Sequence, residues 1–507
     1  MPAPSTDLAA LPPQQSGTTR RPVAEPAPPA RAGTPWWLWT LAGGLFLLYT
    51  ALSWRTHDRL LSHSFDLGIF DQAVRSYAQG RLPVSEVKGP GFPVLGDHFS
   101  PVLALLAPLY WLWPSVKVLL VAQAALIAWS VLPLAGWARE ALGPRAGAVT
   151  GCAYGLSWGI ASGVGFDFHE VAFAVPLLAC SLAALGRGRL RAAACWALPL
   201  VLVKEDLGVT VAVIGLLVAR RGARRTGIAT AVAGLACTLL AVLVLVPAFS
   251  PTGGYFYTGY LGGSGAGSGS GGAPGGLGGL LWRGTAGLVT PQTKLATLVL
   301  VLAPTLFLAV RSPLVLVAVP TLVWRFASDN EAHWGTGYHY SLILMPVVFA
   351  AFVDALHRRG SSPRSLRRYL AGAAAVCLLA LPAFPLWQLV QPATWRTDPR
   401  VAAAHRVMDR IPDGATVQAS DGLVPHLADR TSVSLHGWPD SRRDPEWILV
   451  DTLVPPERRW PLSAMDESVA LAEARARGYR EAAQEDGFLL LRRAGHGASG
   501  PTGRGTG

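Results

Sequence analysis

Charged residues are scarce in this chain. Only 15% of its 507 residues are Asp, Glu, Lys or Arg, whereas 51% are hydrophobic. A typical soluble domain carries about 25% charged residues, so this composition excludes an ordinary soluble enzyme. The mean hydropathy of +0.35 and the repeated long apolar segments predict a polytopic α-helical membrane protein.

Cysteines and nucleotide-binding motifs are also lacking. The five cysteines lie inside apolar segments without C-x-x-C or Cys/His spacing, which excludes a disulfide framework and a zinc finger. No P-loop or D-x-D pattern is evident, so no nucleotide-sugar substrate is indicated. The net charge of +12 comes mainly from arginines in short loops between apolar segments. This pattern indicates membrane topology, and we expect no nucleic-acid partner.

Apolar segments recur at the length needed to cross a membrane. A hydrocarbon core of about 30 Å requires roughly 20 helical residues. By this criterion we expect about eleven membrane helices. They lie at residues 36–54, 116–138, 147–165, 171–185, 192–203, 207–219, 228–248, 295–310, 314–326, 338–356 and 369–390.

The arginine-rich loops set the expected orientation in the cell membrane. Lys and Arg concentrate in cytoplasmic loops. Basic and non-basic loops alternate along this chain only if the N-terminus is cytoplasmic. Residues 98–115, HFSPVLALLAPLYWLWPS, must then lie along the outer surface, because one more span would invert every later basic loop.

The regions outside the membrane domain (36–394) differ in composition. Residues 1–35 and 495–507 lack apolar periodicity and are expected to be disordered, the first in the cytoplasm. Within the membrane domain, outer loops are expected at 55–115 and 249–292, the second with a glycine-rich, flexible stretch. Residues 395–494 alternate between helical and strand patterns, with strands expected at ATVQAS, TSVSLH, EWILVDT and FLLLRR, which predicts a small extracytoplasmic α/β domain.

Polar residues gather in five connections that this topology places on the outer face. Acids and histidines at membrane depth are costly, so their convergence at one interface indicates a functional site. The candidate residues are Asp66, Asp71, Arg75, Asp97, His98, Asp167, His169, Glu170, Lys204, Glu205, Asp206, Arg325, His333 and His339.

Structural roles stay open for several candidates. Asp66 precedes a predicted helix and suits an N-cap, whereas Asp71 could pair with Arg75 four residues further on. Five helical residues separate the two aspartates by about 140°, so we expect them on different faces. An Asx-turn would account for Asp97. No metal is predicted, because DFHE lacks the H-E-x-x-H spacing, although a divalent cofactor stays open.

Several motifs carry a resemblance to known families. Three successive stretches resemble the opening of membrane glycosyltransferases of the GT-C fold, such as protein O-mannosyltransferases and lipid A aminoarabinose transferases. These stretches are FDLGIFDQAVRSYAQG, HFSPVLALLAPLYWLW and GWAREALGPRAG. With FHEVAFAVPLL and LVKEDLG, the chain is more similar still to an uncharacterised prokaryotic family of multispanning proteins, a domain of unknown function. The resemblance covers about residues 36–395.

This resemblance implies sugar transfer from a polyprenyl-phosphate donor to an acceptor in the cell envelope. Asp66 takes the place of the general base, and Leu67 stands where many GT-C enzymes have a second acid, so Asp71 is its candidate substitute. The cationic partners for the phosphate would be Lys204, His98, His169, His333, His339 and Arg325. A lipid or polysaccharide transporter or flippase, and a non-enzymatic scaffold, remain the alternatives.

Overall fold

The structure is a computed structural model that describes residues 33–258, 287 and 290–494. Residues 1–32, residues 495–507 and most of the glycine-rich loop lie outside the described residues. The predictions of disorder and flexibility for these segments therefore stay predictions.

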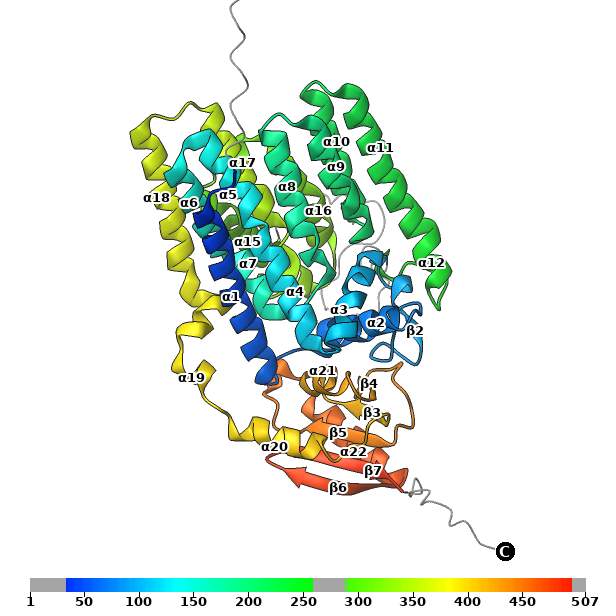
Figure 1. The fold of residues 1–507 in the computed structure, drawn as a ribbon. Coiled ribbons are helices and arrows are strands. Elements are labelled where there is room, and N and C mark those ends of the chain that lie inside the picture. Colours follow the sequence, from blue (N-terminus) through cyan, green and yellow to red (C-terminus); the bar gives the residue numbers. More distant parts are fainter. Residues whose placement is uncertain (1–32, 259–286, 288–289, 495–507) are drawn as a thin grey trace, which may run out of the picture.

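A helical bundle forms the larger part of the molecule, and a small α/β domain lies at one end of it (Figure 1). The bundle and its connections contain these helices: α1 (Trp36–Asp58), α2 (Ile69–Ala78), α3 (Ala107–Leu112), α4 (Val116–Trp129), α5 (Val131–Leu142), α6 (Pro144–Gly155), α7 (Trp158–Phe166), α8 (Ala174–Gly186), α9 (Leu190–Ala197), α10 (Leu207–Arg220), α11 (Arg224–Leu240), α12 (Val246–Phe249), α15 (Gln292–Leu302), α16 (Val319–Ala327), α17 (Leu344–Arg358), α18 (Pro363–Ala380) and α19 (Pro392–Trp395).

Five helical segments are long and apolar enough to cross a membrane: Trp36–Asp58, Val116–Leu142, Arg224–Phe249, His339–Arg358 and Pro363–Ala383. Other predicted spans correspond to shorter apolar helices, such as Leu207–Arg220 and Pro313–Ala327. Proline explains part of the shortening, because Pro199 and Pro320 lie where α-helix and 3-10 turns meet, and Pro313 begins a 3-10 helix. Membrane-spanning helices are thus confirmed, and the count of eleven stays a prediction.

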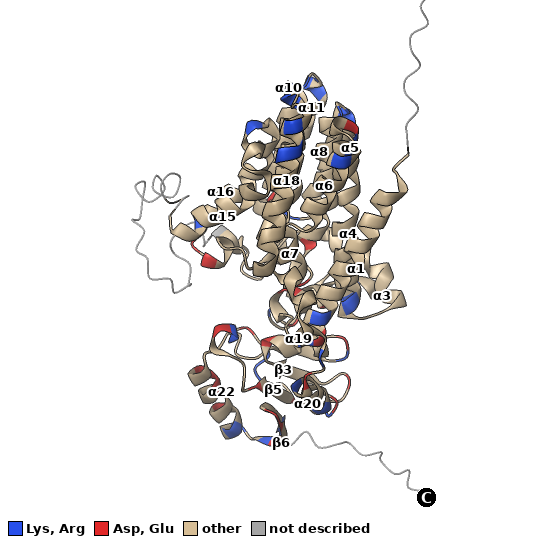
Figure 2. Cartoon of the chain, turned by 90° about the vertical axis from the view of Figure 1, so that its left-hand side faces the viewer, with Lys and Arg blue, Asp and Glu red and all other residues tan. Residues whose placement is uncertain are grey.

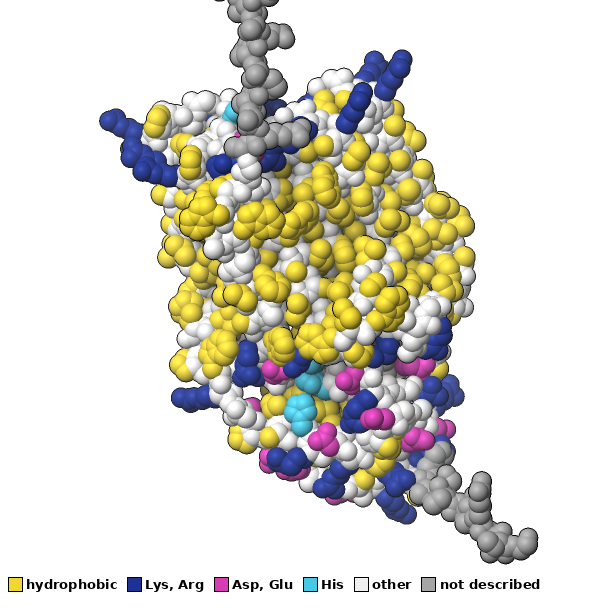
Figure 3. Space-filling model, in the orientation of Figure 1, with side chains coloured by type: hydrophobic (Ala, Val, Ile, Leu, Met, Phe, Trp, Pro, Cys, Tyr) yellow, Lys and Arg dark blue, Asp and Glu magenta, His cyan; other side chains and the backbone are white. Residues whose placement is uncertain are grey.

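The surface of the bundle suits a lipid environment. Apolar side chains cover its middle (Figure 3). On α11 and the turn that follows it, Leu235, Leu239 and Leu243 are each about half exposed or more. Lys and Arg gather at the ends of α5, α10, α11 and α18 that lie away from the α/β domain (Figure 2). The segment Pro101–Leu112 is a short helix beside α2, and it exposes Leu105, Trp111 and Leu112. Its interfacial position stays a prediction.

The C-terminal domain contains one five-stranded sheet of order β4-β3-β5-β7-β6. Its elements are α20 (Pro399–Met408), β3 (Thr416–Ala419), α21 (Val424–Leu427), β4 (Ser432–Leu435), β5 (Trp447–Asp451), α22 (Ala464–Ala476), β6 (Tyr479–Glu485) and β7 (Phe488–Arg493). Strand β3 is parallel to both β4 and β5, and β7 is antiparallel to β5 and β6. The predicted sheet is confirmed. Strand β6 was not predicted, because YREAAQE is an edge strand of mostly exposed polar residues.

The two parts touch through specific polar contacts. The Asp421 carboxylate accepts hydrogen bonds from the backbone N–H and the hydroxyl of Ser64, at 2.8 and 2.5 Å. Gln72 of α2 donates to the carbonyl of Val433 in β4 at 3.0 Å. Arg442 pairs with Glu86, 2.9 Å apart, in the turn between β1 (Val84–Ser85) and β2 (Phe92–Pro93). These contacts hold the α/β domain against the connection that follows α1.

Candidate functional site

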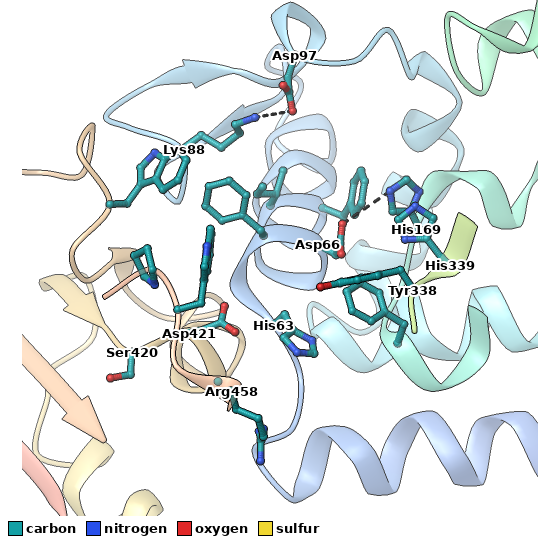
Figure 4. Close-up of a pocket in the computed structure, with 18 of the residues that line it drawn as sticks. His63, Asp66, Lys88, Asp97, His169, Tyr338, His339, Ser420, Asp421 and Arg458 are labelled. Atoms are coloured by element: carbon teal, nitrogen blue, oxygen red, sulfur yellow. Dashed lines mark ion pairs between the residues drawn. The ribbon is translucent and has the colours of Figure 1, made fainter. Parts of the chain in front are cut away.

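A cavity of about 1380 Å³ lies between the bundle and the C-terminal domain. Figure 4 shows Asp66, His169 and His339 on the bundle side, and Ser420, Asp421 and Arg458 on the side of the α/β domain. The cavity is lined by nine of the fourteen predicted candidates: Asp66, Asp97, His98, His169, Lys204, Glu205, Asp206, His333 and His339. Five separate connections of the chain therefore meet here.

Asp66 lies in a wide helical turn, Ser64–Gly68, that leads directly into α2. Its side chain caps neither this turn nor α2, so the N-cap explanation is wrong. The carboxylate lies in the cavity, 3.7 Å from Nε2 of His169, and its side chain is 20% exposed. A carboxylate that is mostly buried and free of a capping bond is available for chemistry.

The surroundings of Asp66 favour its protonated form. Burial and the negative charge of Asp167 raise the pKa of Asp66 to about 7, against the opposing charge of His63. Asp167 is itself buried, with φ 144°, and accepts bonds from the backbone N–H and Nδ1 of His63, at 2.8 and 2.9 Å. Burial lowers the pKa of His63, but the hydrogen bond and the charge of Asp167 outweigh it and raise this pKa to about 9.

Two histidines face Asp66 from distant parts of the chain. The rings of His169 and His339 are stacked, with centroids 3.5 Å apart. Gln123 of α4 fixes the first of these segments, because its amide donates to the carbonyl of Asp167 and accepts from the N–H of His169. Burial lowers the pKa of His169 to about 4, although Glu170 opposes this, so the imidazole is neutral at neutral pH.

A chain of polar contacts continues away from Asp66 towards Lys204. The Glu170 carboxylate lies 2.7 Å from Nδ1 of His169 and 3.2 Å from Nζ of Lys204, without hydrogen-bond geometry to either. Burial lowers the pKa of Lys204, but the charges of Glu170, Glu205 and Asp206 outweigh it and raise this pKa. Lys204 is therefore a permanent cation at the cavity wall.

Asp66, His169 and His339 could together hold a divalent cation. One donor atom from each lies within 4.8 Å of the other two, and carboxylate with imidazole is a common ligand set for zinc. The sequence did not predict this grouping, because His339 is far from the other two along the chain. A cation bound here would occupy the Asp66 carboxylate, so metal binding and proton uptake by Asp66 would compete.

A second cluster of paired polar residues lines the cavity beside Lys204. Lys88 pairs with Asp97, 2.6 Å apart, and Tyr257 donates to the other Asp97 oxygen at 3.2 Å. Glu205 contacts Nδ1 of His98 and the hydroxyl of Tyr255, each at 2.8 Å. Burial alone would raise the pKa of Asp97, but the charge of Lys88 holds it below its usual range. These paired acids shape the wall and hold His98 in place.

The remaining candidates do not line the cavity. Asp71 is fully buried on another face of α2, 2.8 Å from the Tyr110 hydroxyl and 3.2 Å from Arg75, as the helix geometry and the i,i+4 spacing predicted. This placement gives no support to a catalytic role for Asp71 or a binding role for Arg75. Arg325 donates to the carbonyls of His333 and Gly335 and so fixes the loop beside the cavity. Asp167 and Glu170 lie behind the lining of the cavity, where Asp167 contacts His63 and Glu170 contacts Lys204.

One side of the cavity was missed entirely. The α/β domain contributes Ser420, Asp421, His436, Trp438, Asp451, Arg458 and Trp460, and the bundle adds Phe65. A signal existed for part of this set, because Ser420, Asp421, His436 and Asp451 lie at or directly after the carboxyl ends of predicted strands, where open α/β sheets bind ligands.

The comparisons with known proteins agree with this architecture. Residues 56–490 match the family described as "Predicted membrane protein (DUF2079)". The chain belongs to the DUF2079 family. No curated protein matches this DUF2079 protein. Among solved structures, it is similar to ArnT from Cupriavidus metallidurans bound to undecaprenyl phosphate, with a TM-score of 0.53, 15% identity, and coverage of 91% of this chain and 98% of that chain. The apo state of the same ArnT gives a TM-score of 0.45, with 14% identity, 89% and 98% coverage.

The identity is low, so these likenesses concern the fold. The DUF2079 protein has the fold of ArnT, a GT-C fold glycosyltransferase, over most of its length. The expected GT-C-like architecture and the expected family are therefore both confirmed.

Proposed function

We propose that the DUF2079 protein transfers a sugar from a polyprenyl-phosphate donor to an extracytoplasmic acceptor, with Asp66 as the general base. The observation that carries the proposal is the Asp66 carboxylate itself. It makes no helix-capping hydrogen bond, it lies in a large cavity, and its surroundings raise its pKa to about 7. A general base works best when its pKa lies near the working pH. The similarity to ArnT bound to undecaprenyl phosphate supports a lipid-phosphate donor.

The proposed step moves one proton and one sugar. The acceptor hydroxyl donates its proton to a carboxylate oxygen of Asp66 while its oxygen attacks the anomeric carbon. The bond between that carbon and the phosphate oxygen breaks, and the electron pair leaves with the polyprenyl phosphate. Lys204, with His98 and His339 on the same wall, would stabilise the negative charge of the leaving phosphate.

The distribution of ionisable residues favours a transferase over a transporter. Transporters place polar sites near the membrane midplane. Here the cavity and its acids and histidines lie where the bundle meets the α/β domain. The basic ends of α5, α10, α11 and α18 lie at the opposite end (Figure 2), which supports a cytoplasmic N-terminus and an extracytoplasmic α/β domain.

The test uses the purified full-length protein reconstituted in liposomes with a panel of polyprenyl-phosphate sugars. Released polyprenyl phosphate is measured with and without a cell-envelope extract as the acceptor source. We expect release by the wild type and by Asp71→Asn, and strongly reduced release by Asp66→Asn. Equal release by all three proteins, or none by the wild type with any donor, contradicts the proposal.

A further inference from the structure

The edge of the C-terminal sheet that is formed by the carboxyl ends of its parallel strands faces the cavity. The parallel strands β3, β4 and β5 end at this edge, and the order β4-β3-β5 places the later strands on opposite sides of β3. Such a reversal leaves a crevice beyond the carboxyl ends of the strands, where open α/β sheets bind ligands. Asp421 follows β3, His436 follows β4, and Asp451 ends β5, and all three line the cavity. The fold thus provides a binding crevice opposite Asp66.

An aromatic cluster forms part of this crevice. The ring of Phe65 contacts Trp438 and Trp460 edge-on, with centroids 4.6 and 4.7 Å apart. All three residues line the cavity, and Trp460 is 42% exposed. Flat aromatic faces accept the apolar C–H faces of sugar rings. Because Phe65 directly precedes Asp66, a ring held on this cluster would lie next to the proposed base.

Two buried polar atoms at this edge lack a partner. His436 is 6% exposed and lines the cavity. The Nδ1 of His436 lies 3.0 Å from Oε1 of Gln418, whereas the Nε2 of His436 has no partner among the described residues. The indole N–H of Trp438 is also buried without a partner in the described part of the chain. Burial lowers the pKa of His436 to about 4, so its ring is neutral at neutral pH. Unpaired groups of this kind call for a ligand with hydroxyl groups.

The charge of this wall disfavours an anionic ligand. The α/β domain lines the cavity with Asp398, Asp421, Asp440, Asp451, Glu457 and Glu467 against Arg400, Arg458 and Arg459. Two of these arginines are already paired, Arg400 with Asp451 and Arg459 with Glu467. Carboxylates accept hydrogen bonds from hydroxyl groups, so the wall suits a neutral, hydroxyl-rich molecule.

We propose that the carboxyl edge of the C-terminal sheet is the acceptor subsite, and that it binds a carbohydrate that stacks on Trp438 and Trp460 and bonds to His436. This inference rests on the proposed function, since it assigns the acceptor side of the same cavity. The acceptor would reach Asp66 from the α/β domain, while the lipid donor would approach from the bundle.

Saturation-transfer NMR on the full-length protein in nanodiscs tests the subsite directly. The probes are methyl glycosides and oligosaccharides of glucose, mannose, galactose and arabinose, together with a tryptophan-containing peptide. We expect saturation transfer to at least one carbohydrate, a decrease of tenfold or more in affinity for Trp460→Ala, and a smaller decrease for Trp438→Phe. Trp395→Ala is the matched control, because Trp395 is 54% exposed and lies outside the cavity lining.

Two results overturn the subsite: no carbohydrate signal with the wild type, or equal signals in Trp460→Ala and Trp395→Ala. Preference for the peptide over every carbohydrate also overturns it, in favour of a protein acceptor. Undecaprenyl phosphate binding is measured on the same samples and should not change in the tryptophan variants. Absence of undecaprenyl phosphate binding by the wild type, or full turnover by Asp66→Asn, counts against the proposed function instead. Failure of the subsite and failure of the proposed function are therefore distinguishable.

Discussion

Replacement of Asp66 by asparagine should stabilise the protein while it strongly lowers activity. The folded state raises the pKa of Asp66 from 3.8 to about 7, so it binds the proton more tightly than the unfolded chain does. The ionised carboxylate therefore destabilises the fold increasingly as the pH rises from about 4 to about 7, and by a constant amount above that.

The size of the effect follows from the same values. One pKa unit is worth 1.36 kcal/mol, so at pH 8 the ionised carboxylate costs up to about 4 kcal/mol. An asparagine at this position would keep the shape of the side chain without the charge. We expect the free energy of unfolding to rise by roughly 1 to 4 kcal/mol at pH 8, the lower values applying if interactions with His63 and Lys204 are lost. At pH 5 the gain should shrink by about half or more.

The assay is denaturant unfolding in detergent at pH 5 and pH 8, followed by tryptophan fluorescence with chelator present. Asp409→Asn, which makes the same replacement at an exposed residue of the α/β domain, is the matched control. Turnover of Asp66→Asn should fall by about 10²- to 10⁴-fold, the usual contribution of a general base. A variant that is less stable than the wild type at pH 8, or that turns over normally, refutes the reasoning.

Three further predictions concern the same site and its orientation. Because the base must be ionised, kcat/KM should decrease as the pH falls below about 7, and a flat profile between pH 5 and 8 would exclude Asp66 as the titrating group. Chelators should leave activity unchanged, and loss of activity on chelation would show a required metal. Added Zn²⁺ should inhibit by occupying Asp66, His169 and His339, and His339→Ala should weaken that inhibition about tenfold or more. A cysteine at exposed Ser463 should react with an impermeant reagent in intact cells, and one at exposed Ser362 only after lysis; the reverse pattern would invert the topology.

Local sequence features predicted the bundle well but not its interior contacts. Apolar length located the helices, and the helical spacing of Asp66 and Asp71 correctly placed them on different faces. The stacking of His169 on His339 depends on how helices far apart in the chain pack together, and no local pattern records that. For the same reason the sequence predicted no metal site, although Asp66 and these histidines are close enough to hold a cation.

The α/β domain shows the same limit. Short segments rich in apolar and β-branched residues predicted β3, β4, β5 and β7, whereas the polar edge strand β6 gives no such pattern. No sequence pattern assigned Trp438 and Trp460 to the site, because they meet Phe65 only when the domain docks on the bundle. The order of strands, which creates the crevice, is a property of the folded sheet and not of any single strand.

The most direct test of the central claim is the release of polyprenyl phosphate from a polyprenyl-phosphate sugar by the reconstituted protein. We predict release by the wild type and by Asp71→Asn, and a decrease of about 10²- to 10⁴-fold for Asp66→Asn at equal protein level. Release that is unchanged in Asp66→Asn, or undetectable in the wild type across the donor panel, would contradict the assignment of Asp66 as the base of a membrane glycosyltransferase.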